Sequence, residues 1–115
     1  MRPFLLVAVC AGLFAQPAAD LNEALGPSRK RIDAIDRRII QLLNQRAQVV
    51  HEVGVIKQQY HAPASAPGRA RQVLERVATQ ARAPLTPAAL QTIYKTILEQ
   101  MTAMEAAGME NSPRR

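Results

Sequence analysis

An apolar repeat runs through the middle of the chain, and one cation stands inside it. The stretch from Ser28 to Tyr60 contains no proline and a single glycine, Gly54. Its apolar residues recur three and four positions apart, with one gap; in order they are Ile32, Ile35, Ile39, Leu42, Val49, Val53 and Ile56. This spacing predicts a long amphipathic helix, which a second row of Leu43 and Val50 widens. The gap falls at Arg46.

A cation on the apolar face of a helix needs an explanation, because a guanidinium cannot lose its proton to escape burial. A carboxylate of the protein could pair with Arg46, an anionic ligand could bind it, or its side chain could reach the edge of the face. Lys57 follows eleven residues later, about 20° around the helix and about 16 Å along it. The two cations therefore share a face and could close on one small anion.

Arg29 is a third cation, seventeen residues before Arg46. That separation is about 25 Å along the axis and about 100° around it, so Arg29 cannot reach the same ligand from the same helix. A second copy of the helix, running antiparallel, would bring it there. The pattern thus predicts a dimer with shared pockets.

Composition limits which fold classes and which kinds of binding partner are possible. The chain has 115 residues, 3% aromatic residues and no tryptophan, so we expect one small all-α domain with an aliphatic core. The net charge of +6 is spread along the chain, and no basic patch interleaved with aromatic residues predicts a nucleic-acid partner. No His/Cys cluster has metal-ligand spacing and no Ser-His-Asp set is visible, so the sequence predicts neither a metal site nor a catalytic triad.

The first nineteen residues are typical of an export signal. Arg2 precedes an apolar run over residues 4–15, and Ala15, Ala18 and Ala19 offer cleavage points. The run is shorter than the roughly 20 residues that span a bilayer. We expect residues 1–19 to be removed from a periplasmic or secreted protein that keeps no stable membrane association. An uncleaved apolar segment that packs on the domain or anchors it is the alternative.

The remaining breaks predict two shorter helices. Gly26 and Pro27 predict a break, with Ser28 as the N-cap of the long helix. A loop over residues 61–68 precedes a helix over 69–83, and Thr86-Pro87 starts a third helix. The apolar positions of the third helix are Leu90, Ile93, Ile97, Met101 and Met104. We expect a helical domain over residues 20–108 and a disordered tail over 109–115.

The string from Arg29 to Lys57, R-x-x-I-D-x-I-D-x-x-I-x-x-L-L-x-x-R-x-x-V-V-x-x-V-G-x-x-K, resembles the first helix of the all-helical (AroQ-type) chorismate mutases. The isochorismate-pyruvate lyases share that helix. The resemblance implies an intertwined homodimer of three-helix subunits, each with one long N-terminal helix. It also implies the rearrangement of chorismate to prephenate, an isomerase reaction of aromatic amino acid biosynthesis (the shikimate pathway) that needs no cofactor.

The resemblance also implies roles for five residues. Arg46 and Arg29 of the second copy would bind the two substrate carboxylates, and Lys57 would reach a carboxylate and the ether oxygen. Arg69 matches the basic residue that opens the second helix, although a solvated arginine is the simpler interpretation. Glu105 matches the residue that faces the ether oxygen. It would donate a hydrogen bond only when protonated, and a solvated glutamate is the alternative.

Two positions depart from the family pattern. Many members carry a glutamate that binds the substrate hydroxyl directly after the helix-two arginine, and this chain has Ala70 there. The position three before it is often acidic, and this chain has Ala66 or Pro67 there. Two alternatives to a chorismate mutase therefore stay open. One is an isochorismate-pyruvate lyase, and the other is a non-catalytic helical dimer that binds an anion or a protein partner.

Overall fold

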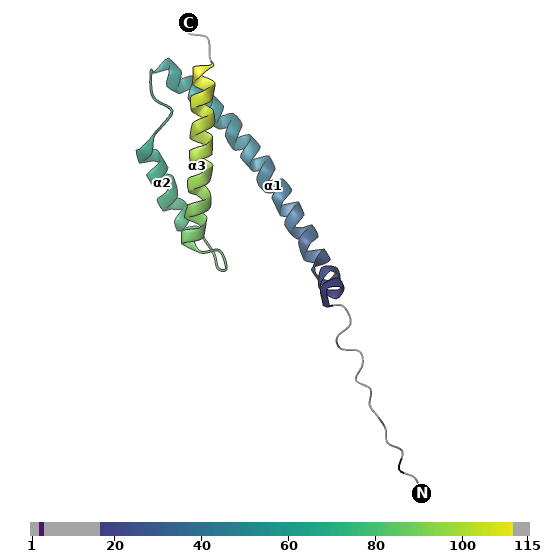
Figure 1. Cartoon of the computed structure of the whole chain (residues 1–115). Helices are drawn as coiled ribbons and strands as arrows, with labels where there is room; N and C mark the ends of the chain where they lie inside the picture. The colour runs from purple at the N-terminus through teal and green to yellow at the C-terminus, as the bar shows by residue number, and fades with distance from the viewer. Residues whose placement is uncertain (1–2, 4–16, 112–115) are drawn as a thin grey trace. The chain divides into compact units, whose positions relative to one another are not determined.

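The computed structural model describes residue 3 and residues 17–111, and the described part is all-helical, as predicted. Its helices are α1 (Pro17–Gln59), α2 (Pro67–Ala78) and α3 (Pro87–Glu110), shown in Figure 1. The chain divides into two compact units, Met1–Ile40 and Gln41–Arg115, so α1 contributes to both. Most of the predicted signal segment and residues 112–115 lie outside the described residues. The export signal and the disorder of the last four residues therefore stay predictions.

The first unit contains the beginning of α1, and the predicted break at Gly26-Pro27 is wrong. The helix continues through Pro27, and Ser28 lies inside it rather than at its N-cap. A proline in a helix removes one hydrogen bond, and its ring also crowds the Cβ of the preceding residue. Gly26 has no Cβ, which relieves that crowding. Asp20 in the first turn also suits the positive end of the helix dipole.

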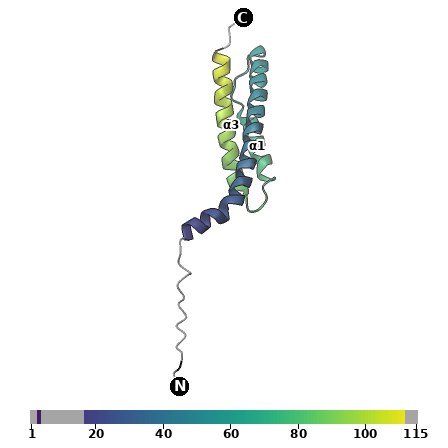
Figure 2. The same ribbon diagram turned by 90° about the vertical axis from the view of Figure 1, so that its right-hand side faces the viewer.

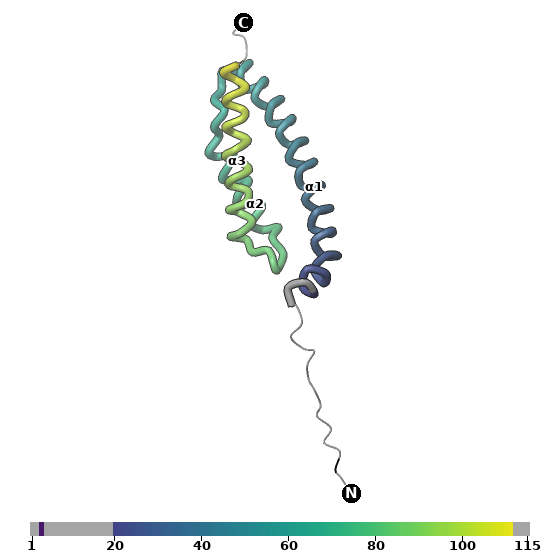
Figure 3. The backbone as a smooth tube through the Cα atoms, turned by 45° about the vertical axis from the view of Figure 1, so that its right-hand side comes forward, coloured from purple at the N-terminus to yellow at the C-terminus, as the bar shows by residue number. Residues whose placement is uncertain are grey.

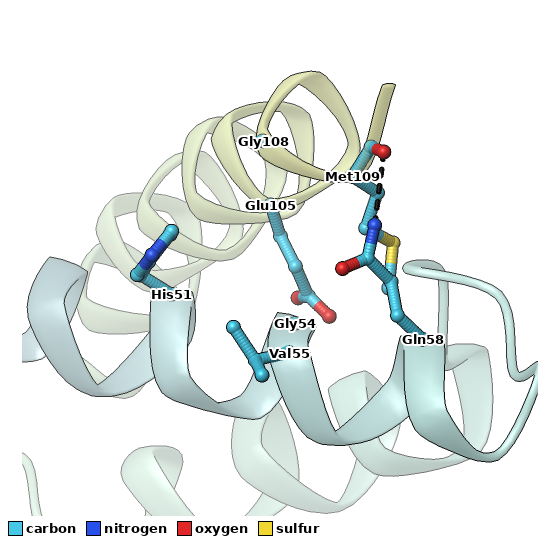
Figure 4. Close-up of a pocket in the computed structure, with 7 residues that line it drawn as sticks. All are labelled: His51, Gly54, Val55, Gln58, Glu105, Gly108 and Met109. Carbon is cyan, nitrogen blue, oxygen red and sulfur yellow. Dashed lines mark hydrogen bonds between the residues drawn. The ribbon is translucent and has the colours of Figure 1, made fainter. Parts of the chain in front are cut away.

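The second unit contains the rest of α1 together with α2 and α3. Helices α2 and α3 pack side by side, as Figures 1 and 3 show. The C-terminal turns of α3 lie beside the last turns of α1 (Figure 2). There Gln58 Nε2 donates to the Met109 carbonyl at 2.9 Å (Figure 4). The buried apolar side chains of the described residues are all in this unit: Val73, Val77 and Met101.

The face that α1 turns toward its own chain in the second unit differs from the prediction. The covered or half-covered positions include Leu43, Arg46, Val50, Gly54 and Lys57. The main apolar stripe lies on another side of the helix and is exposed; in this unit it includes Leu42 (60%), Val49 (55%) and Ile56 (54%). The row predicted only to widen the stripe is therefore the row that packs, and Arg46 lies in it.

The ends of α2 and α3 also differ from the predicted ones. Helix α2 ends at Ala78 rather than near residue 83, because the backbone N–H groups of Thr79 and Gln80 bond to carbonyls three residues back and tighten the last turn. Thr86 caps α3 as predicted, accepting the Ala89 N–H at 3.1 Å. Helix α3 continues to Glu110, two residues into the tail predicted over residues 109–115. The side-chain amide of Gln58 holds this last turn.

A left-handed residue ends α1 and starts the loop to α2. His61 has φ = 55°, its N–H bonds to the Gln58 carbonyl at 3.1 Å, and the Ala62 N–H bonds to the Lys57 carbonyl at 2.8 Å. These two bonds form the Schellman arrangement that commonly closes a helix. The turn brings the following residues back alongside the last turns of α1.

Candidate functional site

A groove of about 550 Å³ lies in the second unit, and three of the predicted site cations line it. They are Arg46 and Lys57 of α1 and Arg69 of α2. The rest of the lining comes from α1, the loop before α2, α2 itself and α3: Val50, Ala64, Ser65, Ala66, Pro67, Ala70, Leu98, Glu99, Met101, Thr102, Ala103 and Ala106. The groove thus joins one cationic side to a largely apolar wall.

Arg46 is half-buried and borders the groove. Over residues 17–111, no carboxylate lies within ion-pair distance of its guanidinium. The sequence allowed three explanations for Arg46. The first, a partner carboxylate of the protein, is not found among the described residues. The guanidinium instead borders an open space large enough for a small anion.

Lys57 is the best-anchored cation of the groove. Its side chain is 22% exposed, and Nζ donates to the Ala64 carbonyl at 2.8 Å. Nζ also lies 2.8 Å from Oε1 of Glu105. The same ammonium therefore connects the loop before α2, the carboxylate of α3 and the groove.

Glu105 is buried, which rules out the alternative of a solvated glutamate. Its side chain is 6% exposed and points from α3 toward Gly54 of α1 (Figure 4). It lines a small adjacent pocket with His51, Gly54, Val55, Gln58, Gly108 and Met109 rather than the groove itself. Oε1 makes the ion pair with Lys57 but accepts no hydrogen bond from the described residues. Glu105 therefore reaches the groove through Lys57.

Gly54 is the residue of this cluster that sequence reasoning missed. It is buried, and a Cβ at this position would lie 3.1 Å from Cγ of Glu105. The absence of a side chain is thus what lets α3 bring Glu105 against α1 beside Lys57. The signal was present in the sequence, because a glycine inside a long helix costs about 1 kcal/mol relative to alanine and needs a packing reason.

The remaining predicted cations occupy different surroundings. Arg69 is exposed, lies in the first turn of α2 and borders the groove. Arg29 belongs to the first unit, where its Nη1 donates to Oδ1 of Asn22 at 3.1 Å. The roles of Arg29, Arg46, Lys57, Arg69 and Glu105 toward a substrate stay predictions.

Residues 17–111 contain neither a metal-binding cluster nor a membrane-spanning helix. No group of three or more His, Cys, Asp or Glu side chains there could hold a metal ion. No helix in that part of the chain combines the length and apolar character needed to cross a membrane.

The chain resembles known proteins over most of its helical part. The profile of the family described as "Chorismate mutase type II" matches residues 28–106. Two proteins named "Bifunctional chorismate mutase/prephenate dehydratase" are similar. The one from Neisseria gonorrhoeae is 32% identical over 85 residues, 74% of this chain. The one from Aquifex aeolicus is 40% identical over 55 residues, 48% of this chain.

The fold also matches a solved structure. The crystal structure of chorismate mutase from Helicobacter pylori in complex with prephenate superposes with a TM-score of 0.72 at 22% identity, covering 79% of this chain and 99% of that one. The curated relatives are much longer, and the matched segments span 23% of the Neisseria protein and 15% of the Aquifex protein. Residues 28–106 include Arg29, the cations of the groove and Glu105. On the match over these residues, the chain belongs to the type II chorismate mutase family.

Proposed function

We propose that the chain is a chorismate mutase that rearranges chorismate to prephenate. The observation that carries this proposal is the groove in which Arg46 and Lys57 converge from one helix and Arg69 joins them from α2. A cation without a carboxylate partner beside a cavity is suited to an anionic ligand, and chorismate carries two carboxylates. Membership of the type II chorismate mutase family supports this choice of anion.

The reaction makes demands that this groove meets. A one-substrate pericyclic rearrangement needs no nucleophile, but it needs the compact conformer of the substrate to be held in place. It also gains rate from positive charge placed where the breaking ether oxygen becomes electron-rich. In the proposed complex, Arg46 and Arg69 bind carboxylates and the Lys57 ammonium faces the ether oxygen. Glu105, at 2.8 Å from Lys57, positions that ammonium and partly offsets its positive charge.

We propose further that two copies of the chain share their sites in a homodimer. The main apolar stripe of α1 supports this, because Ile32, Ile35 and Ile56 are 54–55% exposed in the single chain. Monomeric proteins rarely leave a continuous apolar face of this kind uncovered. The dimer would also supply Arg29 of the second copy to a groove whose own subunit provides Arg46 and Lys57.

The direct test is to incubate the protein with chorismate and, separately, with isochorismate. We expect chorismate to disappear and prephenate to form, with isochorismate unchanged. Formation of salicylate and pyruvate from isochorismate would instead identify a lyase. Loss of neither substrate, together with tight prephenate binding by calorimetry, would identify a non-catalytic anion-binding dimer.

Mixing two inactive variants tests the shared site. If Arg29→Ala and Arg46→Ala subunits exchange, half of the dimers are mixed, and each mixed dimer rebuilds one intact site. We therefore expect recovery of about a quarter of wild-type activity from an equimolar mixture. Two sites that each lie within one subunit would recover no activity. Sedimentation of the wild-type protein should give twice the chain mass.

We also propose that the mature protein is exported to the periplasm or the medium after removal of residues 1–19. The apolar run over residues 4–15 and the small residues that follow it support this. Expression of the full chain in a bacterial host, followed by fractionation and N-terminal sequencing, tests it. A cytoplasmic protein that retains residue 1 would overturn it.

A further inference from the structure

We infer that Thr102 of α3 recognises the ring hydroxyl of the substrate and replaces the acidic residue that this chain lacks at Ala70. This inference rests on the proposed function. Chorismate presents two carboxylates, an ether oxygen and one secondary hydroxyl. The cations of the groove account for the charged groups and the ether oxygen, so the hydroxyl needs a separate polar partner.

The wall opposite the cations offers few candidates. Ala70 lines the groove, and so do four other alanines, which cannot bond a hydroxyl through their side chains. Apart from the three cations, only Ser65, Glu99 and Thr102 bring a polar side chain to the lining. A hydroxyl buried without a partner loses its hydrogen bonds to water, so a selective site must contain a partner for it.

The threonines of α3 show which hydroxyl is available. Thr92 and Thr96 are exposed, and each donates to the carbonyl four residues earlier in its own helix, at 3.1 and 3.3 Å. Thr102 is half-buried, lines the groove, and its hydroxyl bonds to no other described residue. A threonine hydroxyl both donates and accepts, which matches the two needs of a substrate hydroxyl.

The other two candidates are placed less well. Ser65 is exposed in the loop before α2. The side chain of Glu99 is 61% exposed and lies 3.9 Å from Lys95 in the preceding turn, so its carboxylate has water and a cation as partners. Thr102 lies between Leu98 and Ala106, four residues from each, and both of these residues line the groove. Its helix face is therefore the wall of the site.

The test compares Thr102→Val, which removes the hydroxyl and keeps the shape, with Thr102→Ser, which keeps the hydroxyl. Each is assayed with chorismate and with an analogue that lacks the ring hydroxyl. We expect Thr102→Val to lower kcat/KM for chorismate about three- to tenfold, the worth of one neutral hydrogen bond, and to leave the analogue within about twofold. Thr102→Ser should retain the preference for chorismate. Thr96→Val, away from the groove, is the matched control and should leave kcat/KM unchanged for both substrates.

Three further variants keep the result decisive. Adding an acceptor with Ala70→Glu to the Thr102→Val protein should restore the preference for chorismate over the analogue. An equal loss on both substrates in Thr102→Val would show a packing effect and overturn the inference. A loss of preference in Ser65→Ala or Glu99→Gln, with Thr102→Val unchanged, would also overturn it. Failure of the wild-type protein to convert chorismate would instead remove the proposed function, so the two failures are distinguishable.

Discussion

The part of α1 in the first unit and the part in the second carry the same kind of apolar repeat but make different contacts. From residue 27 to residue 40 every residue is exposed, including Ile32, Ile35 and Ile39. After Gln41, one face of the helix is covered by its own chain, and Arg46, Gly54 and Lys57 lie on it. The same helix therefore has one region that packs within the chain and another whose apolar side chains have no packing partner among residues 17–111.

The difference shows that periodicity predicts an amphipathic helix but not which molecule covers its face. In the second unit the covered row lies beside the main stripe, displaced around the helix axis. It includes a glycine and two cations among its apolar residues. A row that packs on the same chain beside the groove includes such residues. A row that a second copy would cover in the proposed dimer needs only matching aliphatic side chains, and the first unit carries such a row.

Removing a groove cation should give the largest effect and separates the two regions by function. We expect Arg46→Ala and Lys57→Ala each to lower kcat/KM at least a hundredfold, because each removes a charge that binds or activates the dianion. Arg38→Ala, on the exposed part of α1, is the matched control and should change kcat/KM less than twofold. Circular dichroism checks that each variant is folded. Equal effects of Arg38→Ala and Arg46→Ala would abolish the functional distinction between the two regions.

Adding one methyl group to a glycine tests the packing of the second region. Gly54→Ala forces Cγ of Glu105 to move, and we expect a net loss of about 1 kcal/mol in the free energy of unfolding, since overpacking outweighs the gain in helix propensity. Gly68→Ala in α2 is the control, because nothing lies within 4 Å of the added methyl group. Urea denaturation measures both. A stabilised Gly54→Ala protein would show that α3 adjusts freely against α1.

Replacing the buried carboxylate should change activity rather than the fold. Glu105→Gln keeps the size of the side chain but removes the negative charge that lies 2.8 Å from Nζ of Lys57. We expect kcat/KM for chorismate to fall about three- to fivefold, because the ammonium loses part of the contact that holds it beside the groove. Steady-state kinetics measure this, and circular dichroism checks that the variant is folded. An unchanged kcat/KM would leave Glu105 a structural contact between α1 and α3 only.

Relaxing the turn after α1 should give the smallest effect. His61 adopts φ = 55°, a region that glycine enters without steric cost. We expect His61→Gly to raise the free energy of unfolding by about 0.5 kcal/mol, the relief of strain being partly offset by the greater freedom of glycine in the unfolded chain. Tyr60→Gly, inside the same turn but without a positive φ, should lower it. Thermal unfolding of both variants distinguishes the two outcomes.

The sequence predicted the helical class, the three helices and the shared face of Arg46 and Lys57. These features depend on helical period and N-cap chemistry, which are local. Arg69 was placed with the two cations only by the resemblance to the chorismate mutases. The continuation through Pro27 escaped prediction, because a glycine before a proline can either break a helix or make the proline tolerable inside it. The sequence left open whether Glu105 is buried, because that depends on Gly54, which lies 51 residues away along the chain.

The hydrogen bond from Lys57 to the Ala64 carbonyl couples the conformation of the loop before α2 to the position of the Lys57 ammonium. That loop carries the groove residues Ser65, Ala66 and Pro67. A ligand that draws the Lys57 ammonium toward itself would also weaken the hydrogen bond that holds the loop at one side of the groove. Changes in the length or composition of residues 62–66 should therefore change the affinity of the groove for its ligand, even though every charged side chain stays in place.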